Sequence, residues 1–362
     1  MAQSFLPRLS AAFFTALGRF ATRCADAIRA RPALAAWFEV PETAEDVYRR
    51  ENLRAFSRLS EQERMLADGP RMAFYHEAVT RSIRPGDRVI DLGTGTGILA
   101  AFAARRGAGK VYALDHSSIL DHARELAQYN GINGVEFVSI HSRDFTLREQ
   151  VDVILHEQMG DFLFDEAMVA NVTDLRDRLL KPGGIIVPAR FELYCEPVKA
   201  NDDRRVPFIW ELNVHGYDYS PLAWHRPQAP RYYHHHGCDP TVIDRFLGTP
   251  QPALTFDLHT LLPDQLPKEI RVVRTVERAG RLDGFAVFFR ALADDTLSLS
   301  SNPLDRGRAP HWGFPILRTE SVDYAAGDQI ELTLSAENWA DPETWRWRHR
   351  RHDPQSGFSG QP

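Results

Sequence analysis

The chain has 362 residues, of which 43% are hydrophobic and 25% charged, and this length predicts two domains rather than one. Its net charge of −6 argues against a nucleic-acid partner, and no stretch reaches the roughly 18 apolar residues that a membrane span requires. Three scattered cysteines without a pairing pattern favour a reducing compartment, so we expect a cytoplasmic protein.

Residues 1–48 form a predicted N-terminal helical segment. Apolar residues recur at three- to four-residue spacing between Leu9 and Ile28, which is the period of one helix face. The first 25 residues also lack acids and contain three arginines, a pattern that transit peptides share. We favour a helix that packs on the body of the protein or on a partner, with targeting as the alternative.

Residues 49–188 alternate between predicted strands and helices. Five short apolar runs are typical of parallel strands buried on both faces: RVIDLG, VYALD, VEFVSI, VDVILHE and GIIVP. Helical stretches separate them and end at Gly107, Gly131 and the Pro182–Gly184 turn. This order predicts an α/β, Rossmann-like parallel-sheet domain with its ligand at the carboxyl ends of the strands.

Residues 189–352 change in character. Strand-like segments follow one another with turns between them and no long helix, which predicts a β-barrel or sandwich. The adjacent histidines at 234–236 would point to opposite faces of a strand, so we expect no metal site. The run WRWRHRRH at 345–352 suits an edge strand with one packed face better than a nucleic-acid patch. Residues 353–362 are polar and rich in glycine and proline, and we expect a flexible tail.

A glycine-rich turn follows the first predicted strand. Gly93, Gly95 and Gly97 let the backbone approach a ligand closely, and the helix that begins directly afterwards offers unpaired N–H groups. Asp115 ends the second strand, where its carboxylate can accept hydrogen bonds from both hydroxyls of a ribose. The arrangement predicts a site for an adenosine-containing cofactor.

Two classes of cofactor fit this turn. Gly95, Gly97 and Ala100 match the dinucleotide fingerprint of a nicotinamide enzyme. Asp91 would, however, place a negative charge beside a pyrophosphate, whereas S-adenosylmethionine, with its sulfonium and ammonium groups, tolerates an acid there. The unit of alternating strands and helices also follows an N-terminal segment rather than starting the domain, and this counts against a dehydrogenase. We therefore favour a methyltransferase with Asp91 in its cofactor site, and keep the dehydrogenase as the alternative.

The segment after the fourth predicted strand adds a resemblance. His156–Asp161, continuing to Glu166, is similar to the double-E loop of protein arginine methyltransferases, which are class I S-adenosylmethionine-dependent enzymes. Further matches to that family occur in the same order between residues 52 and 336: MLADGPR, HSSILDHARELAQYN, LLKPGGIIVPAR, WELNVHGYD and APHW. The resemblance implies a β-barrel domain behind the cofactor domain, a dimerisation arm near residues 200–240, and a homodimer.

Two glutamates of this loop carry the predicted chemistry. A guanidinium stays protonated at neutral pH, so its nitrogen must be oriented and its charge drawn elsewhere before it can attack a methyl group. Glu157 and Glu166 can clamp the planar group between two carboxylates, with Gly160 as the hinge of the loop. The alternative for Glu166 is a cap of the following helix, and the neighbouring motifs favour the clamp.

Further site residues follow from the resemblance alone. His311 matches the family's proton acceptor and Asp68 its acidic partner; the alternative for His311 is a loop histidine that packs on Trp312. Arg71 matches the residue that pairs with the cofactor's carboxylate. Asp144 matches the acid that contacts the adenine.

Several pocket residues depart from the family pattern. The departures are Asn52 and Phe56 in place of paired tyrosines, Gln158 in place of tryptophan, Asp161 in place of tyrosine, and Pro310 in place of threonine. Asp161 adds a carboxylate suited to the α-ammonium of free arginine or of another small guanidine. We expect an arginine N-methyltransferase acting on protein substrates, with a small guanidine substrate and a catalytically silent dimeric scaffold as alternatives. The residues expected beside the substrate are Met65, Asp161 and Trp312.

Overall fold

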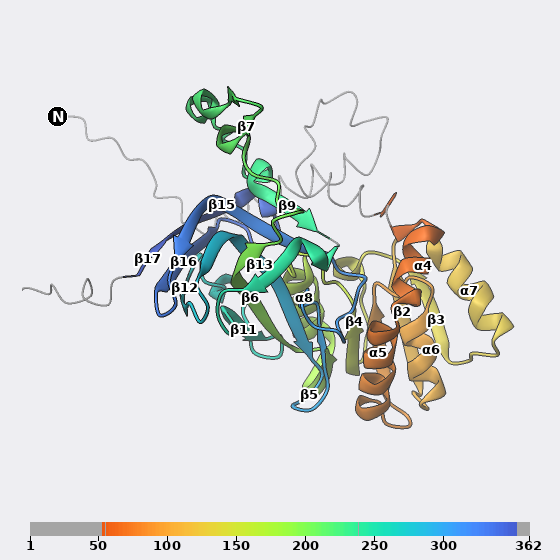
Figure 1. Ribbon diagram of the computed structural model, residues 1–362. Coiled ribbons are helices and arrows are strands. Elements are labelled where there is room, and N and C mark those ends of the chain that lie inside the picture. Colours follow the sequence, from red (N-terminus) through yellow and green to blue (C-terminus); the bar gives the residue numbers. More distant parts are fainter. Residues whose placement is uncertain (1–52, 55, 238, 353–362) are drawn as a thin grey trace, which may run out of the picture. The chain divides into compact units, whose positions relative to one another are not determined.

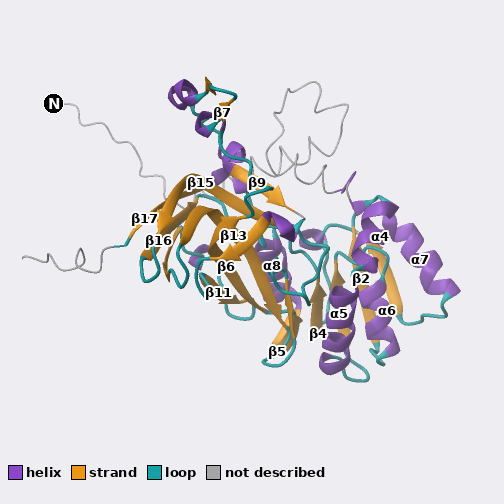
Figure 2. Cartoon of the chain, viewed as in Figure 1, coloured by secondary structure: helices purple, strands orange, loops and turns teal. Residues whose placement is uncertain are grey.

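The computed structural model describes residues 53, 54, 56–237 and 239–352, and the predicted N-terminal helical segment and C-terminal tail lie outside this range. The described elements belong to a compact unit that begins at Phe56. A parallel α/β part comes first and an antiparallel β part follows, as the sequence predicts (Figure 1 and Figure 2). No described helix is long and apolar enough to cross a membrane.

Five parallel strands form the first sheet, in the order β3-β2-β1-β4-β5. Their bounds are β1 Arg88–Leu92, β2 Lys110–Asp115, β3 Val135–Ser139, β4 Val151–His156 and β5 Leu180–Val187. The order reverses between β1 and β4, and doubly wound sheets bind ligands at such a point. Because Leu92 pairs with His156 at the ends of these two strands, the glycine turn and the double-E loop leave the sheet next to each other.

Helices precede and connect these strands. They are α4 Leu59–Ala67, α5 Gly69–Ser82, α6 Ile98–Arg105, α7 Ile119–Tyr129 and α8 Met168–Leu179, with a 3-10 turn, η1 Ser142–Asp144, after β3. At the start of α5, the Asp68 carboxylate accepts a hydrogen bond from the Arg71 backbone N–H at 2.9 Å, and Pro70 lies in the first turn. Both are features that begin helices, and they fix two predicted site residues at the α4–α5 junction.

The antiparallel part contains a seven-stranded and a three-stranded sheet. The larger sheet contains β6 Arg190–Ala200, β9 His234–Gly237, β10 Ile243–Phe246, β11 Leu254–Asp257, β13 Gly280–Leu292, β14 Ser298–Ser300 and β15 Phe314–Tyr324. The smaller contains β12 Glu269–Thr275, β16 Gln329–Ala336 and β17 Trp345–Arg351, and short 3-10 turns are η5 Pro240–Val242, η6 Pro263–Gln265 and η7 Pro342–Thr344. β17 is the predicted edge strand, with Trp345 buried and Arg346 and Arg348 exposed.

A segment between β6 and β9 projects from the antiparallel part, around the β7 label in Figure 1. It contains a hairpin, β7 Asn213–Val214 and β8 Tyr217–Asp218, and the 3-10 turns η2 Ile209–Glu211, η3 Ser220–His225 and η4 Pro230–Tyr233. An ion pair between Arg205 and Asp283 at 2.8 Å holds its base, where the Arg318 guanidinium also lies 4.0 Å from the Phe208 ring centroid. Farther out, Trp224 is 90% exposed.

One apolar core runs through both parts of this unit. The double-E loop joins them, because its Phe162, Leu163 and Phe164 are all buried. Phe162 packs edge-to-face on Trp345, with ring centroids 5.1 Å apart, and Phe164 stacks on Phe256 at 5.5 Å. Burying each ring contributes about 1.5–3 kcal/mol. The antiparallel part therefore fixes the position of a loop that begins in the parallel sheet.

Candidate active site

The glycine turn after β1 has the backbone that its sequence predicts. Gly93, Gly95 and Gly97 have φ angles of 71°, 54° and 82°, which residues with a side chain rarely adopt. The Gly95 N–H donates to Asp115 Oδ2 at 3.0 Å, so the turn reaches the end of β2. A Cβ at Gly95 would lie 2.9 Å from Gln62 Oε1, so this glycine also lacks room for a side chain. The turn is thus an open backbone cradle of the kind an adenosine cofactor needs.

Asp91 braces this turn from inside. Its carboxylate is fully buried, and Oδ2 accepts hydrogen bonds from Thr94 Oγ1 at 2.5 Å and from the Ala100 N–H at 3.0 Å. Oδ1 has no hydrogen-bond partner among the described residues. Burial raises the pKa of Asp91 to about 7. A cationic group placed near Oδ1 would lower that pKa, which agrees with a cofactor that carries positive charge.

Arg71 connects the α4–α5 junction to the double-E loop. Its side chain is only 7% exposed, and Nη2 lies 2.5 Å from Glu157 Oε2. Nη1 donates to the Met65 carbonyl at 2.9 Å, and the Met65 sulfur lies 3.8 Å from Nη2. Arg71, predicted to bind the cofactor, therefore directly contacts Glu157, predicted to belong to the clamp. Met65, predicted to lie beside the substrate, contacts Arg71 through its carbonyl and its sulfur.

The double-E loop concentrates acids at the predicted clamp. Besides Glu157 it carries Asp161, Asp165 and Glu166. Burial, followed by the charges of Glu157 and Asp165, raises the pKa of Glu166 well above its usual range. Burial and the neighbouring Asp161 raise the pKa of Asp165 to about 7. The ionised acids of such a loop repel one another, and a bound cation relieves that repulsion.

His311 and Asp68 meet, but not through the histidine ring. The Asp68 Oδ2 atom accepts a hydrogen bond from the His311 backbone N–H at 2.8 Å. The ring of His311 packs edge-to-face on Trp312, with centroids 5.3 Å apart, and its Nδ1 has no partner among the described residues. Burial lowers the pKa of His311 below its usual value, so the ring is neutral and able to accept a proton near neutral pH.

Two hydrogen bonds join the double-E loop to the loop that carries His311. The Trp312 indole N–H donates to the Met159 carbonyl, and the Gly313 N–H donates to Asp161 Oδ1 at 2.8 Å. We call this pair of bonds the loop clasp. Trp312 is buried, 2% exposed, and Asp161 uses one carboxylate oxygen in the clasp, so both predicted substrate residues lie where they hold the two loops together.

The remaining predicted residues lie around these loops. Asp144 is exposed in η1, which follows β3, and the nearby Ile140 donates its N–H to the Asp115 carbonyl at 3.0 Å. Gln158 accepts a hydrogen bond from Asn171 Nδ2 at 3.4 Å. Asn52 lies outside the described residues. Within the described part of the chain, no group of three or more His, Cys, Asp or Glu side chains is arranged to hold a metal ion.

Three supporting residues were missed by sequence reasoning. Gln62 faces the glycine turn and donates to the Phe56 carbonyl at 2.9 Å. The Tyr75 hydroxyl donates to the His156 carbonyl at 3.1 Å, directly before Glu157, and the His156 ring contacts the Pro188 carbonyl at 2.7 Å. Burial lowers the pKa of His156 to about 4, so this ring is neutral and positions the end of β4.

Comparison with known proteins first defines the class. Residues 74–188 match the family model described as ribosomal protein L11 methyltransferase (PrmA). This match agrees with the parallel sheet, the glycine cradle and the acid at the end of β2, and it indicates an S-adenosylmethionine-dependent methyltransferase rather than a nicotinamide enzyme.

Full-length relatives define the family. Protein arginine N-methyltransferase PRMT10 of Oryza sativa subsp. japonica is 32% identical over 310 residues, covering 77% of this chain and 81% of the relative. The crystal structure of Arabidopsis thaliana protein arginine methyltransferase 10 is similar at a TM-score of 0.67 and 28% identity, covering 83% of this chain and 99% of that one. A Trypanosoma brucei PRMT1 enzyme-prozyme complex with AdoHcy shares the fold, at a TM-score of 0.69 and 22% identity, covering 83% of this chain and 96% of that one. The chain belongs to the protein arginine N-methyltransferase family.

Proposed function

We propose that this chain transfers a methyl group to a guanidinium nitrogen of arginine residues in protein substrates, with Glu157 and Glu166 as the clamp. The observation that supports this most directly is the acidic double-E loop at the switch point of the parallel sheet, where the glycine cradle also lies. A planar cation satisfies two facing carboxylates bidentately, which an ammonium cannot do.

The cofactor would be held by residues at the ends of β1, β2 and β3 and by one residue of helix α5. The cradle of Gly93, Gly95 and Gly97 admits a ligand close to the backbone, and Asp115 stands at the end of β2 for the ribose. Arg71 would contact the carboxylate of the cofactor, Asp91 would lie on the side of its ammonium group, and Asp144 would contact its adenine. Bound S-adenosylmethionine supplies the electrophilic methyl group.

The clamp orients the nucleophile. Glu157 is already paired with Arg71, so its carboxylate is held in one place before a guanidinium arrives. Burial and the charge of Glu157 raise the pKa of Glu166, and a positive charge that enters the clamp lowers it and so favours the ionised carboxylate. The two carboxylates then hold the guanidinium charge away from the nitrogen that reacts, and they exclude alternative orientations of the planar group.

Methyl transfer releases a proton, and we assign His311 as its acceptor. A guanidinium nitrogen that gains an N–C bond must lose one proton, and the bound cofactor would supply the methyl group and retain the electron pair of its S–C bond. His311 is neutral, and its Nδ1 is unpaired among the described residues, so it can accept that proton. Asp68 fixes the His311 backbone and caps α5 at the same time, which ties the proton acceptor to the helix that carries Arg71.

The use of Asp161 in the loop clasp favours a protein substrate over free arginine. The hypothesis of a free guanidine rests on Asp161 as a ligand for an α-ammonium, and one oxygen of that carboxylate is bonded to the Gly313 N–H. The test offers radiolabelled S-adenosylmethionine with an arginine-rich peptide and with free L-arginine, followed by product analysis. Label on the peptide supports the proposal. Label on free arginine alone overturns it, and cofactor binding without label on either supports the silent scaffold.

We further propose that the segment between β6 and β9 is a dimerisation arm. Its large apolar side chains are open to solvent: Trp224 is 90%, Tyr217 70% and Val206 67% exposed. Large apolar side chains exposed along one projecting segment are suited to being covered by a partner. The double variant W224E/Y217E should convert a homodimer to a monomer, measured by size-exclusion chromatography with light scattering. Tyr129 on α7 is as exposed as Trp224, and Y129E tests whether α7 belongs to the surface on which the partner's arm packs. A wild-type monomer would refute the proposal.

A further inference from the structure

The three-stranded sheet of β12, β16 and β17 presents one face to the core and the other to solvent. On the inner face of β17, Trp345 is fully buried and Trp347 is half-buried. Because side chains alternate along a strand, Arg346, Arg348 and Arg350 lie together on the outer face, and all three are exposed. We call these three residues the arginine row. In Figure 1 this sheet lies on the side of the compact unit away from α4–α7.

The acid of β16 on this outer face is covered by basic side chains. Glu331 lies opposite Arg350 and pairs with it at 3.0 Å. The same carboxylate lies 3.6 Å from Arg271 of β12 and 2.8 Å from His352. Its side chain is only 3% exposed, so little negative charge reaches the surface here. The outer face of the sheet is therefore basic at its centre.

Two residues of the arginine row have no acid of their own. Among the described residues, Arg346 donates only to backbone carbonyls, those of Glu343 at 2.8 Å and Trp345 at 2.9 Å. Arg348 has neither a hydrogen-bond nor an ion-pair partner in the described part of the chain. The acid in the same cross-strand row as Arg346 is Glu269 on β12, two strands and about 10 Å away. Both guanidinium groups are therefore available to an anionic partner.

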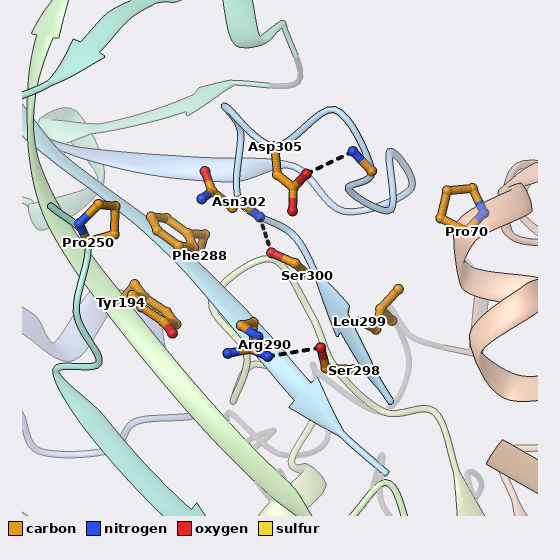
Figure 3. A pocket seen from close by; sticks show the side chains of 11 residues that line it. Pro70, Tyr194, Pro250, Phe288, Arg290, Ser298, Leu299, Ser300, Asn302 and Asp305 are labelled. Atoms are coloured by element: carbon orange, nitrogen blue, oxygen red, sulfur yellow. Dashed lines mark hydrogen bonds between the residues drawn. The ribbon is translucent and has the colours of Figure 1, made fainter. Parts of the chain in front are cut away.

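The pocket drawn in Figure 3 shows the contrast. Its arginine, Arg290, donates to Ser298 Oγ at 3.0 Å and pairs with Glu192 at 3.2 Å. Asp305 lines the same pocket, so an anion there would meet a neutralised arginine and a carboxylate. The arginine row, whose charge is largely uncompensated, is the better site for an anionic partner.

β17 also has an open backbone edge. It is the last strand in the order β12-β16-β17 and pairs with no other described strand. The His352 N–H donates to the Gln329 carbonyl at 2.8 Å, and in an antiparallel ladder only every second residue bonds to the partner strand. The backbone of the arginine row therefore bonds to β16, whereas Trp347 and His349 direct their N–H and C=O groups outward. Such an edge can take an added strand.

An extended acidic peptide uses the charges and the edge at once. Alternate residues of a strand lie about 6.5–7 Å apart, so the arginine row and every second side chain of an added strand share one repeat. Acids at alternate positions would then stand opposite arginines, and directly opposed charges of opposite sign stabilise paired strands. A polynucleotide would use the charges and leave the backbone groups of the edge without partners. The observations therefore favour a polypeptide.

We propose that β17 is a docking edge for an extended acidic segment of a partner protein. The segment pairs with the open backbone of Trp347 and His349 and is selected by Arg346 and Arg348. None of the proposed cofactor, clamp or proton-accepting residues belongs to this sheet, so the docked segment does not compete with an arginine at the double-E loop. The acids of that loop repel the same segment, which favours its docking at β17.

Fluorescence anisotropy measures binding of a labelled peptide to the full chain. The probe has the length of β17, seven residues, and alternates glutamate with threonine. Each comparison probe removes one feature: glutamine replaces glutamate, N-methyl groups block alternate backbone amides, or a thymidine oligonucleotide of equal length replaces the peptide. The glutamate peptide should bind most tightly, about three- to tenfold better than the glutamine peptide at low salt, the range of a few exposed pairs of opposite charge.

Variants of the arginine row isolate the charge contribution. R346E/R348E should weaken binding of the glutamate peptide about tenfold or more, because two attractions become repulsions, and should change binding of the glutamine peptide little. The matched control R84E/R105E makes the same change of net charge at exposed arginines outside this sheet, and it should leave both affinities unchanged. AdoHcy affinity, measured for each variant, reports that the protein remains folded.

Amide hydrogen exchange locates the bound peptide. Binding should protect the amides of Trp347 and His349, which face the open edge, and leave the amide of Arg348, already bonded to β16, unchanged. Absence of glutamate-peptide binding would mean that the arginines only guard the edge against self-association, and it would overturn the proposal. Equal affinity of R346E/R348E and wild type, or tighter binding of the oligonucleotide without amide protection, would overturn it as well. The measurement requires no methyl transfer, so its result is independent of the proposed function.

Discussion

The loop clasp makes a prediction that distinguishes two roles for Asp161. In D161A the Gly313 N–H loses its acceptor, and an unsatisfied buried donor costs about 1–3 kcal/mol. Removing the charge also relieves Asp165, whose pKa Asp161 helps to raise, so we expect a net loss near the lower end of that range, about 1 kcal/mol. The loop carrying His311 is then held to the double-E loop by Trp312 alone. A displacement of about 1 Å between proton acceptor and clamp costs on the order of 100-fold in kcat.

The matched variant is D161N, which keeps an oxygen acceptor and removes the charge. A positioning role predicts that D161N retains most of kcat while D161A loses about 10- to 100-fold, on peptide and free arginine alike. The assay is steady-state methyl transfer with both substrates, alongside urea unfolding of each variant. If D161N and D161A lose activity equally, and only with free arginine, the carboxylate binds an α-ammonium and our reasoning is refuted.

Three further outcomes follow from the site. The kcat should fall in acid, and the midpoint of that fall should lie at a pH below 6.5, the ordinary histidine value. The reason is that burial lowers the pKa of His311 and the reaction requires the neutral ring. If the pH–rate profile of H311N falls in acid at the same midpoint as wild type, the assignment of His311 is contradicted. G95A should weaken AdoHcy binding about five- to tenfold, measured by calorimetry, because a side chain is strained at φ 54° and would meet Gln62. The control G131A has a similar φ of 65° but lies in an open turn, and it should leave AdoHcy affinity unchanged. Equal affinities for G95A and G131A would contradict the cradle. D165N should stabilise the substrate-free protein most at a pH of about 8 relative to wild type, less at about 5, and little below the ordinary carboxyl value of 3.8. A carboxyl whose folded pKa is raised to about 7 contributes its full stability only below the unfolded pKa, and that contribution is lost as pH rises from there through the folded pKa. An unchanged pH dependence of unfolding in the variant contradicts the shift.

The parallel sheet could be predicted from sequence because its physics is local. The three central strands, β1, β2 and β4, are largely apolar runs that end at or directly before a glycine or an acid, and a sheet buried on both faces leaves little other use for such runs. The edge strand β3 differs from the expectation, because it has no buried residue. The glycine turn and Asp115 were predicted for the same reason. Their geometry depends on adjacent residues and on the fixed order of strands in a doubly wound sheet.

Contacts between distant segments could not be predicted in this way. Nothing at Asp161 or Gly313 indicates that they are bonded, since 152 positions separate them. The same holds for Asp68, which was expected to partner His311 as a proton acceptor and instead accepts its backbone N–H. Backbone donors look alike in every sequence, so a side chain used to hold a loop resembles one that is free for a ligand.

The central claim is that Glu157 and Glu166 clamp a guanidinium. The most direct measurement is single-turnover methyl transfer to an arginine peptide by wild type, E157Q and E166Q. Cofactor affinity is measured in parallel for each protein. The account predicts methylarginine from wild type and a loss of roughly 100- to 1,000-fold in each variant, the range expected when one partner of a buried charge pair is removed. E166Q should retain full cofactor affinity. Wild-type rates in both variants, or label on a residue other than arginine, would contradict the clamp.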